Sequence, residues 1–136
     1  MPHNTISTFL ADVCEAIIVK YGEELVTLPQ TQEEWLEVSD EIGLRCNFHT
    51  AIGAIDGKHI VIKAPVISGY IYNNYNCFFA ITLVGIVDTD CKFLWVDVGT
   101  NGSALDCAVL NQSDLKTVLE NNILGLPSPR PLPGDV

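Results

Sequence analysis

The first part of the chain has apolar residues at the spacing of an α-helix. One stripe between residues 4 and 22 is formed by Ile6, Phe9, Leu10, Val13 and Ile17. This spacing places the five side chains on a single helical face. Asn4 or Thr5 can cap the start of the helix, and Gly22 stands where it is expected to end.

A second helix is predicted to begin at Thr31. The sequence from Thr31 to Glu34 has the pattern of a capping box, in which the two end residues exchange hydrogen bonds with each other's backbone. Apolar residues then recur on one face up to Ile42, and Gly43 is expected to end the helix. The other face is expected to be solvated because it carries Glu33, Glu34, Glu37, Asp40 and Glu41.

Between residues 51 and 98 the pattern becomes that of β-strands. Strands are predicted within residues 51–62, 78–87 and 93–98. The run 78–87 is continuously apolar and rich in β-branched residues, which is typical of a central strand buried on both faces. Residues 88–92 form a tight connection, so the last two strands are expected to be antiparallel neighbours. Residues 65–76, with three tyrosines, indicate an irregular loop or hairpin.

A helical pattern returns from residue 103 to 121, with a break near residues 111–113. The end of the chain, from residue 126 to 136, holds four of the seven prolines and is expected to be neither helix nor central strand. Helices, three strands and a helix make an α/β order with a small sheet. We therefore expect the front part of a larger α/β domain.

Composition limits the class of protein. The chain has 136 residues, of which 48% are apolar and 18% charged, so we expect one folded domain and not a disordered chain. The longest apolar run is about half the length of a membrane span, and no basic region precedes an apolar core at the N-terminus. We expect a soluble, non-secreted protein. The net charge of −10 argues against nucleic-acid binding unless a metal or local basic cluster reverses it.

The five cysteines contain no CxxC pair and their number is odd. This excludes a disulfide framework and a zinc ribbon. We expect buried free thiols in a reducing, intracellular compartment.

Asp56 is the first candidate for chemistry. It follows a run without polar side chains, and strand alternation places it on the same face as Ile52 and Ala54. A carboxylate at the end of a buried strand is costly unless it is paired or binds a metal. The sequence leaves an alternative open, in which Asp56 and Gly57 form only a turn.

Asp106 is the second candidate, in the block from Gly102 to Asp106. Its alternative is also structural, because Ser103 and Asp106 match an acidic variant of the capping box. Lys58, His59 and Lys63 cluster after Asp56 and would suit an approaching phosphate backbone. A lone histidine is usually structural, however, and the sequence does not decide between these roles.

The block GAIDGKHI, from Gly53 to Ile60, resembles the first catalytic block of the PIF/Harbinger transposase family and its domesticated nucleases. Further resembling blocks follow in the family's order, including residues 92–99, 101–103, Asp106 and the segment 124–127. The resemblance covers nearly the whole chain from residue 5. At Asn76 and Cys77 the chain departs from the Lys-Gly pair that is common in the family.

The resemblance implies a DDE-type endonuclease with a partial RNase H-like core. It implies an N-terminal helical segment at residues 5–44 and a partial endonuclease domain at 45–136. Such enzymes cut DNA phosphodiesters with two divalent ions, Mg²⁺ or Mn²⁺, held by carboxylates. By position, Asp56 is the family's first catalytic acid and a metal ligand, and Asp106 is a second metal ligand. Two further acids are implied beyond residue 136.

Two classes of function stay open. The first is a transposase-derived, metal-dependent nuclease in the nucleus, incomplete and inactive as this chain, which binds DNA weakly. The second is a non-catalytic, domesticated remnant that serves as a protein- or DNA-interaction module. The family resemblance also implies a Myb-like DNA-binding partner protein. In a third, more distant interpretation the chain is another α/β fold and Asp56 is a turn residue.

Overall fold

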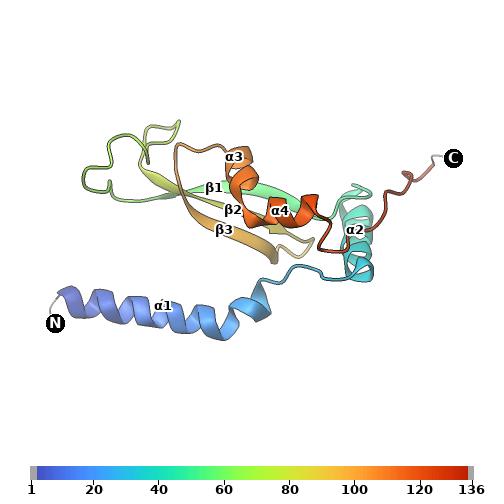
Figure 1. The fold of residues 1–136 in the computed structure, drawn as a ribbon, viewed down its shortest axis with the longest axis horizontal. Helices are drawn as coiled ribbons and strands as arrows, with labels where there is room; N and C mark the ends of the chain where they lie inside the picture. The colour runs from blue at the N-terminus through green and yellow to red at the C-terminus, as the bar shows by residue number, and fades with distance from the viewer. Residues whose placement is uncertain (1–2, 135–136) are drawn as a thin grey trace.

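The computed structural model describes residues 3–134 and is a mixed α/β structure (Figure 1). Two helices come first, three antiparallel strands follow, and two short helices close the sequence of elements, so the predicted α/β order is confirmed. The elements are α1 (His3–Leu25), α2 (Gln32–Cys46), β1 (Ala54–Val61), β2 (Ala80–Val87), β3 (Phe93–Asn101), α3 (Asp106–Gln112) and α4 (Asp114–Glu120).

Helix α1 forms where the apolar stripe predicts it, but its predicted end at Gly22 is wrong. The helix continues to Leu25, and the Val26 N–H donates to the Gly22 carbonyl at 3.0 Å. A glycine inside a helix costs only about 1 kcal/mol, which the surrounding turns tolerate. Every side chain described from residue 5 to 21 is exposed, so the apolar stripe has no partner among the described residues.

Helix α2 begins as the sequence predicts. The Glu34 N–H donates to Thr31 Oγ1 at 3.3 Å, and the Thr31 N–H donates to a Glu34 carboxylate oxygen at 3.4 Å, which confirms the capping box. The acidic face is exposed, as expected. The predicted end at Gly43 is wrong, because Gly43 packs against the His49 ring inside the helix, and Asn47 in the left-handed region caps the end instead.

The sheet has the strand order β1–β2–β3, and the predicted central position of β2 is confirmed. Ala80, Thr82 and Val84 on one face of β2 are fully buried. The connection at residues 88–92 is tight because Asp88 Oδ1 accepts hydrogen bonds from the backbone N–H groups of Asp90 and Lys92, each at 2.9 Å. These contacts keep β2 and β3 as antiparallel neighbours.

Strand β1 runs straight through the Asp-Gly pair. Asp56 is paired with Gly85 and Gly57 with Val84, so the turn interpretation of this pair is wrong. Asp-Gly favours a turn locally, but eight consecutive residues of β1 pair with β2, and this pairing outweighs the local preference.

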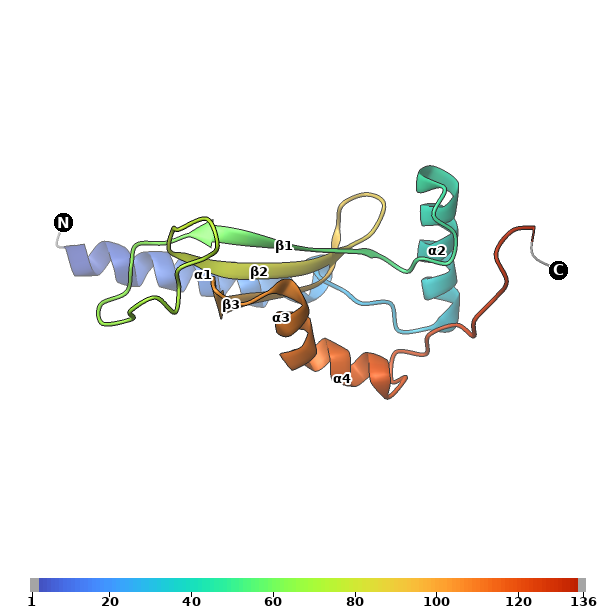
Figure 2. The same cartoon turned by 90° about the horizontal axis from the view of Figure 1, so that it is seen from above.

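Helices α3 and α4 lie on one side of the sheet (Figure 2). The predicted break is confirmed at Ser113, which ends α3 and caps α4 by accepting the Lys116 N–H. The proposed capping box of Ser103 and Asp106 is wrong. Leu105 occupies the cap position without a side-chain bond, and the Ser103 hydroxyl donates to Asn101 Oδ1 at 3.0 Å.

The core lies where α2, β3, α4 and the residues that follow α4 meet. It is formed by Trp35, Leu94, Leu115 and Leu124. Trp35 Nε1 donates to the Leu124 carbonyl at 3.0 Å, and Arg130 pairs with Asp40, so residues 124–130 are tied to α2. The proline-rich segment was predicted at residues 126–136. As predicted, its described part, up to residue 134, contains no helix or strand.

The expectation of buried thiols is wrong, because all five cysteines are exposed and unpaired. The sheet has few fully enclosed positions, and none falls on a cysteine. Within residues 3–134, no helix combines the length and apolar character needed to cross a membrane.

Candidate active site

Asp56 lies in the third position of β1, on a strand whose only described neighbour is β2. Its side chain is exposed, and Oδ1 accepts the N–H of the next residue, Gly57, at 2.8 Å. The strand therefore presents this carboxylate to solvent while a local hydrogen bond holds it close to the backbone of Gly57.

Asp106 is the first residue of α3, and the connection between β3 and α3 places it beside β1. Its carboxylate contacts Gly57 on the face where a Cβ would stand. Any residue larger than glycine at this position would displace the carboxylate. The glycine that suggests a turn in the sequence therefore acts inside a strand, where it leaves room for an acid from another element.

Asp56 and Asp106 both contact Gly57, from different directions. Alternation along β1 puts the Cβ of Asp56 on the face opposite to the one that Asp106 covers. Because one carboxylate bonds the Gly57 nitrogen and the other lies over its Cα, their nearest oxygens are within about 8 Å of each other. The structure thus places the two predicted acids on either side of Gly57 in an exposed strand, with Asp56 rooted on the face opposite to Asp106.

The three basic candidates do not form one cluster. His59 shares the face of Gly57 and Asp106, and its Nε2 lies 3.1 Å from the Gly102 carbonyl. Alternation places Lys58 on the opposite face, with the Cβ of Asp56. Lys63 follows the end of β1 and is exposed. Lys58 therefore lies on the face of Asp56, and His59 on the face of Asp106, with which it lines one cavity.

A cavity of about 160 Å³ lies between β1 and the segment that leads into α3. It is lined by Gly57, His59, Tyr75, Gly102, Ser103, Ala104, Leu105 and Asp106. Sequence reasoning singled out His59 and Asp106 but missed Tyr75 and the two glycines. The cluster of three tyrosines in the loop was the available signal for Tyr75.

The donor atoms at Gly57 suit a hard divalent cation. Mg²⁺ prefers oxygen ligands and is commonly bound by one or two carboxylates, with water in its remaining positions. Asp56 and Asp106 supply two carboxylates, which reach Gly57 from opposite faces of β1, so a shared ion would require a side-chain rotation at the strand edge. Within residues 3–134, no group of three or more His, Cys, Asp or Glu side chains is arranged to hold a metal ion. The described residues therefore fit one weakly held ion better than a two-metal centre.

Residues 55–135 match the protein family described as DDE superfamily endonuclease. The chain belongs to this family. The match includes Asp56, Gly57 and Asp106, so the geometry described above lies inside the endonuclease region. The resemblance noted in the sequence blocks is confirmed.

The curated relatives point the same way. The protein named "Putative nuclease HARBI1" from Rattus norvegicus is 28% identical over 131 residues, which cover 96% of this chain and 36% of the relative. Its namesake from Homo sapiens is 26% identical over 116 residues, covering 85% of this chain and 33% of the relative. The chain spans about a third of the length of the curated relatives it matches. No solved structure matches it.

Proposed function

We propose that this chain supplies the first part of the active site of a transposase-derived, metal-dependent DNA endonuclease with an RNase H-like core. Residues 5–44 form a helical segment that precedes the endonuclease domain at residues 45–136. The observation that supports this most is the meeting of Asp56 and Asp106 at Gly57, inside the region that matches the DDE family. The substrate would be a DNA phosphodiester, and the protein would act in the nucleus.

Asp56 and Asp106 would hold Mg²⁺ or Mn²⁺ through their carboxylates. When bound, such an ion polarises a phosphate and lowers the pKa of a bound water. Asp56 presents its oxygens at an exposed strand, which leaves room for a DNA backbone. His59, which lines a cavity with Asp106, and the exposed lysines Lys58 and Lys63 would contact phosphate oxygens, and the two lysines would offset part of the negative charge of the chain.

The same geometry predicts that this chain alone does not cut DNA. Two-metal catalysis needs enough carboxylates to hold both ions and set their spacing. Two acids at Gly57 can hold one ion, with nothing to place an attacking water opposite the leaving oxygen. The net charge of −10 further opposes the approach of DNA.

Titration with Mn²⁺ by calorimetry tests the site. We expect weak binding that Asp56→Asn abolishes, while Asp12→Asn leaves it unchanged because Asp12 is an exposed acid on α1. Equal binding by both variants would remove Asp56 from the metal site. Plasmid nicking with Mn²⁺ is expected to be absent, and cleavage that depends on Asp56 would show that the chain is a complete nuclease.

A second candidate function is a non-catalytic interaction module. The observation that favours it is the apolar face of α1, which has no partner among the described residues. In this alternative α1 would contact a partner, for which a Myb-like DNA-binding protein is the proposal. Loss of partner binding on changing Ile6 and Leu10 to Ser, with Mn²⁺ binding absent in the unchanged chain, would favour this function over the nuclease.

A further inference from the structure

The loop at residues 62–79, between β1 and β2, contains a hydrogen-bonded turn at residues 74–78. The side chain of Asn74 is buried, and its Oδ1 accepts the backbone N–H groups of Asn76 and Phe78 at 3.0 and 3.2 Å. The Asn74 N–H donates to the Phe78 carbonyl at 3.0 Å, and Asn73 forms a bridge with Phe79. Asn74 therefore fixes the turn that carries Tyr75.

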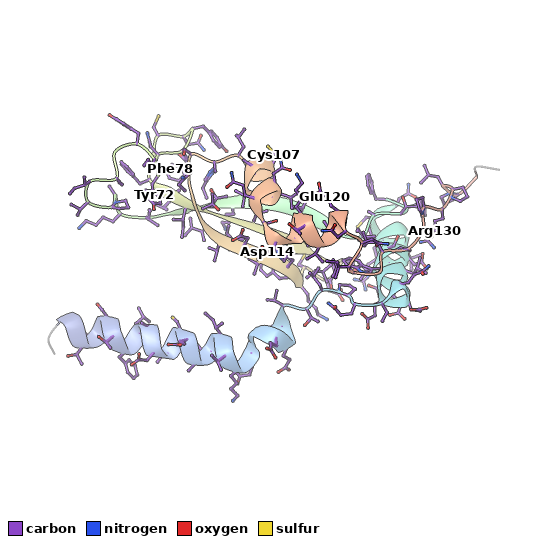
Figure 3. The ribbon with its side chains drawn as sticks, viewed as in Figure 1. Tyr72, Phe78, Cys107, Asp114, Glu120 and Arg130 are labelled. Carbon is purple, nitrogen blue, oxygen red and sulfur yellow. The ribbon has the colours of Figure 1, made fainter. Side chains whose placement is uncertain are left out.

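Tyr75 stands on this turn with 79% of its surface exposed. Its ring meets the ring of His59 edge to face, with centroids 5.5 Å apart, and His59 in turn meets Phe78 at 6.3 Å. Figure 3 shows Phe78 and Tyr72 at the end of the sheet that lies away from α2 and Arg130. The phenol thus contacts the His59 ring, which is itself packed against Phe78, and most of its surface stays open to solvent.

Tyr75 also lines the cavity that contains Gly57 and Asp106. A flat group stacked on the phenol would therefore lie beside Asp106, one of the two acids of the proposed site. The loop exposes a second ring nearby in sequence, Tyr70, which is 82% exposed. An exposed ring on a hydrogen-bonded turn is already placed for a ligand with a planar ring, which lowers the cost of binding such a ligand.

The charge around β1 and this loop is more balanced than the charge of the whole chain. Between residues 54 and 79, Asp56 is the only acid and Lys58 and Lys63 are basic, and Asp106 of α3 adds a second carboxylate at Gly57. The two lysines therefore match the two carboxylates, whereas the whole chain has a net charge of −10. A polyanion would meet less repulsion here than the net charge of the chain implies.

We propose that Tyr75 is a stacking site for an unpaired base of single-stranded DNA, in the cavity that it shares with Asp106. Single-stranded nucleic acids are bound by aromatic rings beside basic residues, and each stacked base contributes through its π-face without base specificity. The inference rests on the proposed function in its choice of DNA, and it adds that the strand at the site has at least one unstacked base. Lys63, at the start of the loop, would contact the phosphate backbone.

The test is fluorescence anisotropy with the full 136-residue chain and a fluorescein-labelled oligo-dT of about 20 nucleotides, longer than a single binding site of this kind. EDTA is present, so that binding is measured without metal or cleavage. We expect Tyr75→Ala to raise the Kd about tenfold, the effect of losing one stacked base. Tyr75→Phe keeps the ring and should keep the affinity, and Tyr21→Ala on α1 should change nothing.

An oligonucleotide of the same length with abasic sites keeps the phosphates and removes the bases. The unchanged chain should bind it about as weakly as Tyr75→Ala binds oligo-dT, a comparison that needs no folded variant. Absence of oligo-dT binding, or equal binding of abasic and normal strands, would overturn the inference. Binding that depends on Tyr75 but is joined by no Asp56-dependent Mn²⁺ binding would uphold the stacking site and refute the proposed nuclease site.

Discussion

Helices α1 and α2 carry similar apolar stripes, but the stripe of α1 is exposed and the stripe of α2 is buried. On α1, Phe9 is 68% and Ile6 is 56% exposed, whereas on α2 Trp35 is 2% and Ile42 is 8% exposed. Figure 1 shows α2 at the end of the sheet and α1 apart from it. Periodicity predicts both helices equally well, because it reports the face that a helix could bury. Whether that face is buried depends on what the rest of the fold brings to it.

The difference lies in the partners that reach α2. Its apolar face packs against Leu94 of β3, Leu115 of α4 and Leu124 of the segment that follows. The Trp35 indole adds a hydrogen bond to the Leu124 carbonyl, which satisfies its one polar group inside the core. The apolar side chains of α1, among them Ile6 and Phe9, stay exposed. The stability of the fold should therefore depend on α2 and hardly on α1.

The largest expected effect comes from Trp35→Ala. The substitution leaves a cavity at the centre of the core and removes the partner of the Leu124 carbonyl, so we expect the free energy of unfolding to fall by about 3–5 kcal/mol. Urea denaturation followed by circular dichroism measures it. The matched substitution Phe9→Ala on α1 should change the free energy by less than about 0.5 kcal/mol. Similar losses in the two variants would show that α1 is packed in solution.

A smaller effect is expected from adding one methyl group to a glycine in each region. A Cβ on Gly102 would meet the backbone carbonyl oxygens of Ala80 and Tyr72 at 2.6 and 2.9 Å, so the strand or the loop must shift. We expect Gly102→Ala to lower the free energy of unfolding by about 1–3 kcal/mol.

On α1 the same substitution should act in the other direction. A Cβ on Gly22 meets only Ile18 Cγ2, at 3.7 Å, which is an ordinary contact. Gly22→Ala should therefore raise the far-ultraviolet helical signal, because alanine favours a helix over glycine by about 1 kcal/mol. The urea midpoint of the core should not move. A lowered midpoint for Gly22→Ala, or an unchanged one for Gly102→Ala, would contradict the contrast between the regions.

Much of this architecture could be predicted from the sequence because it depends on local signals. The Thr31 capping box, the tight turn after β2, the break at Ser113 and the central β2 strand each depend on residues close together in the chain. The helix ends at Gly22 and Gly43 were predicted wrongly for one reason. A glycine shows that a helix can stop, but a hydrogen bond or a packing contact decides whether it does.

The site shows the same limit. Asp56 and Asp106 could be proposed from their positions, but the part played by Gly57 could not. In the sequence Asp-Gly indicates a turn, and only the pairing of β1 with β2 and the return of α3 show that this glycine makes space for a carboxylate. Tyr75 was part of an irregular loop with three tyrosines. Asn74 holds it in place through an Asx turn to the Asn76 N–H and a second bond to the Phe78 N–H, and several asparagines in the loop could have made such a turn.

The smallest expected effect concerns the ion pair that joins α2 to the β2–β3 connection. Arg45, in the last turn of α2, donates to Asp90 Oδ1 at 2.6 Å, and both side chains are about half exposed. The hydrogen bond from Arg45, together with its charge, lowers the pKa of Asp90 below its ordinary value.

A folded-state pKa that is lower than the unfolded one favours folding at neutral pH, where the carboxylate is charged in both states. This contribution is lost as the pH falls from the ordinary carboxyl pKa through the lowered one. Because the pair is exposed, solvent screens it and the effect on stability is small. An NMR titration of the Asp90 carboxyl carbon should give a higher midpoint in Arg45→Gln than in the unchanged chain, and the same midpoint in Lys20→Gln on α1. An Asp90 midpoint that is the same in Arg45→Gln and in the unchanged chain would mean that α2 is held to the sheet by its apolar face alone.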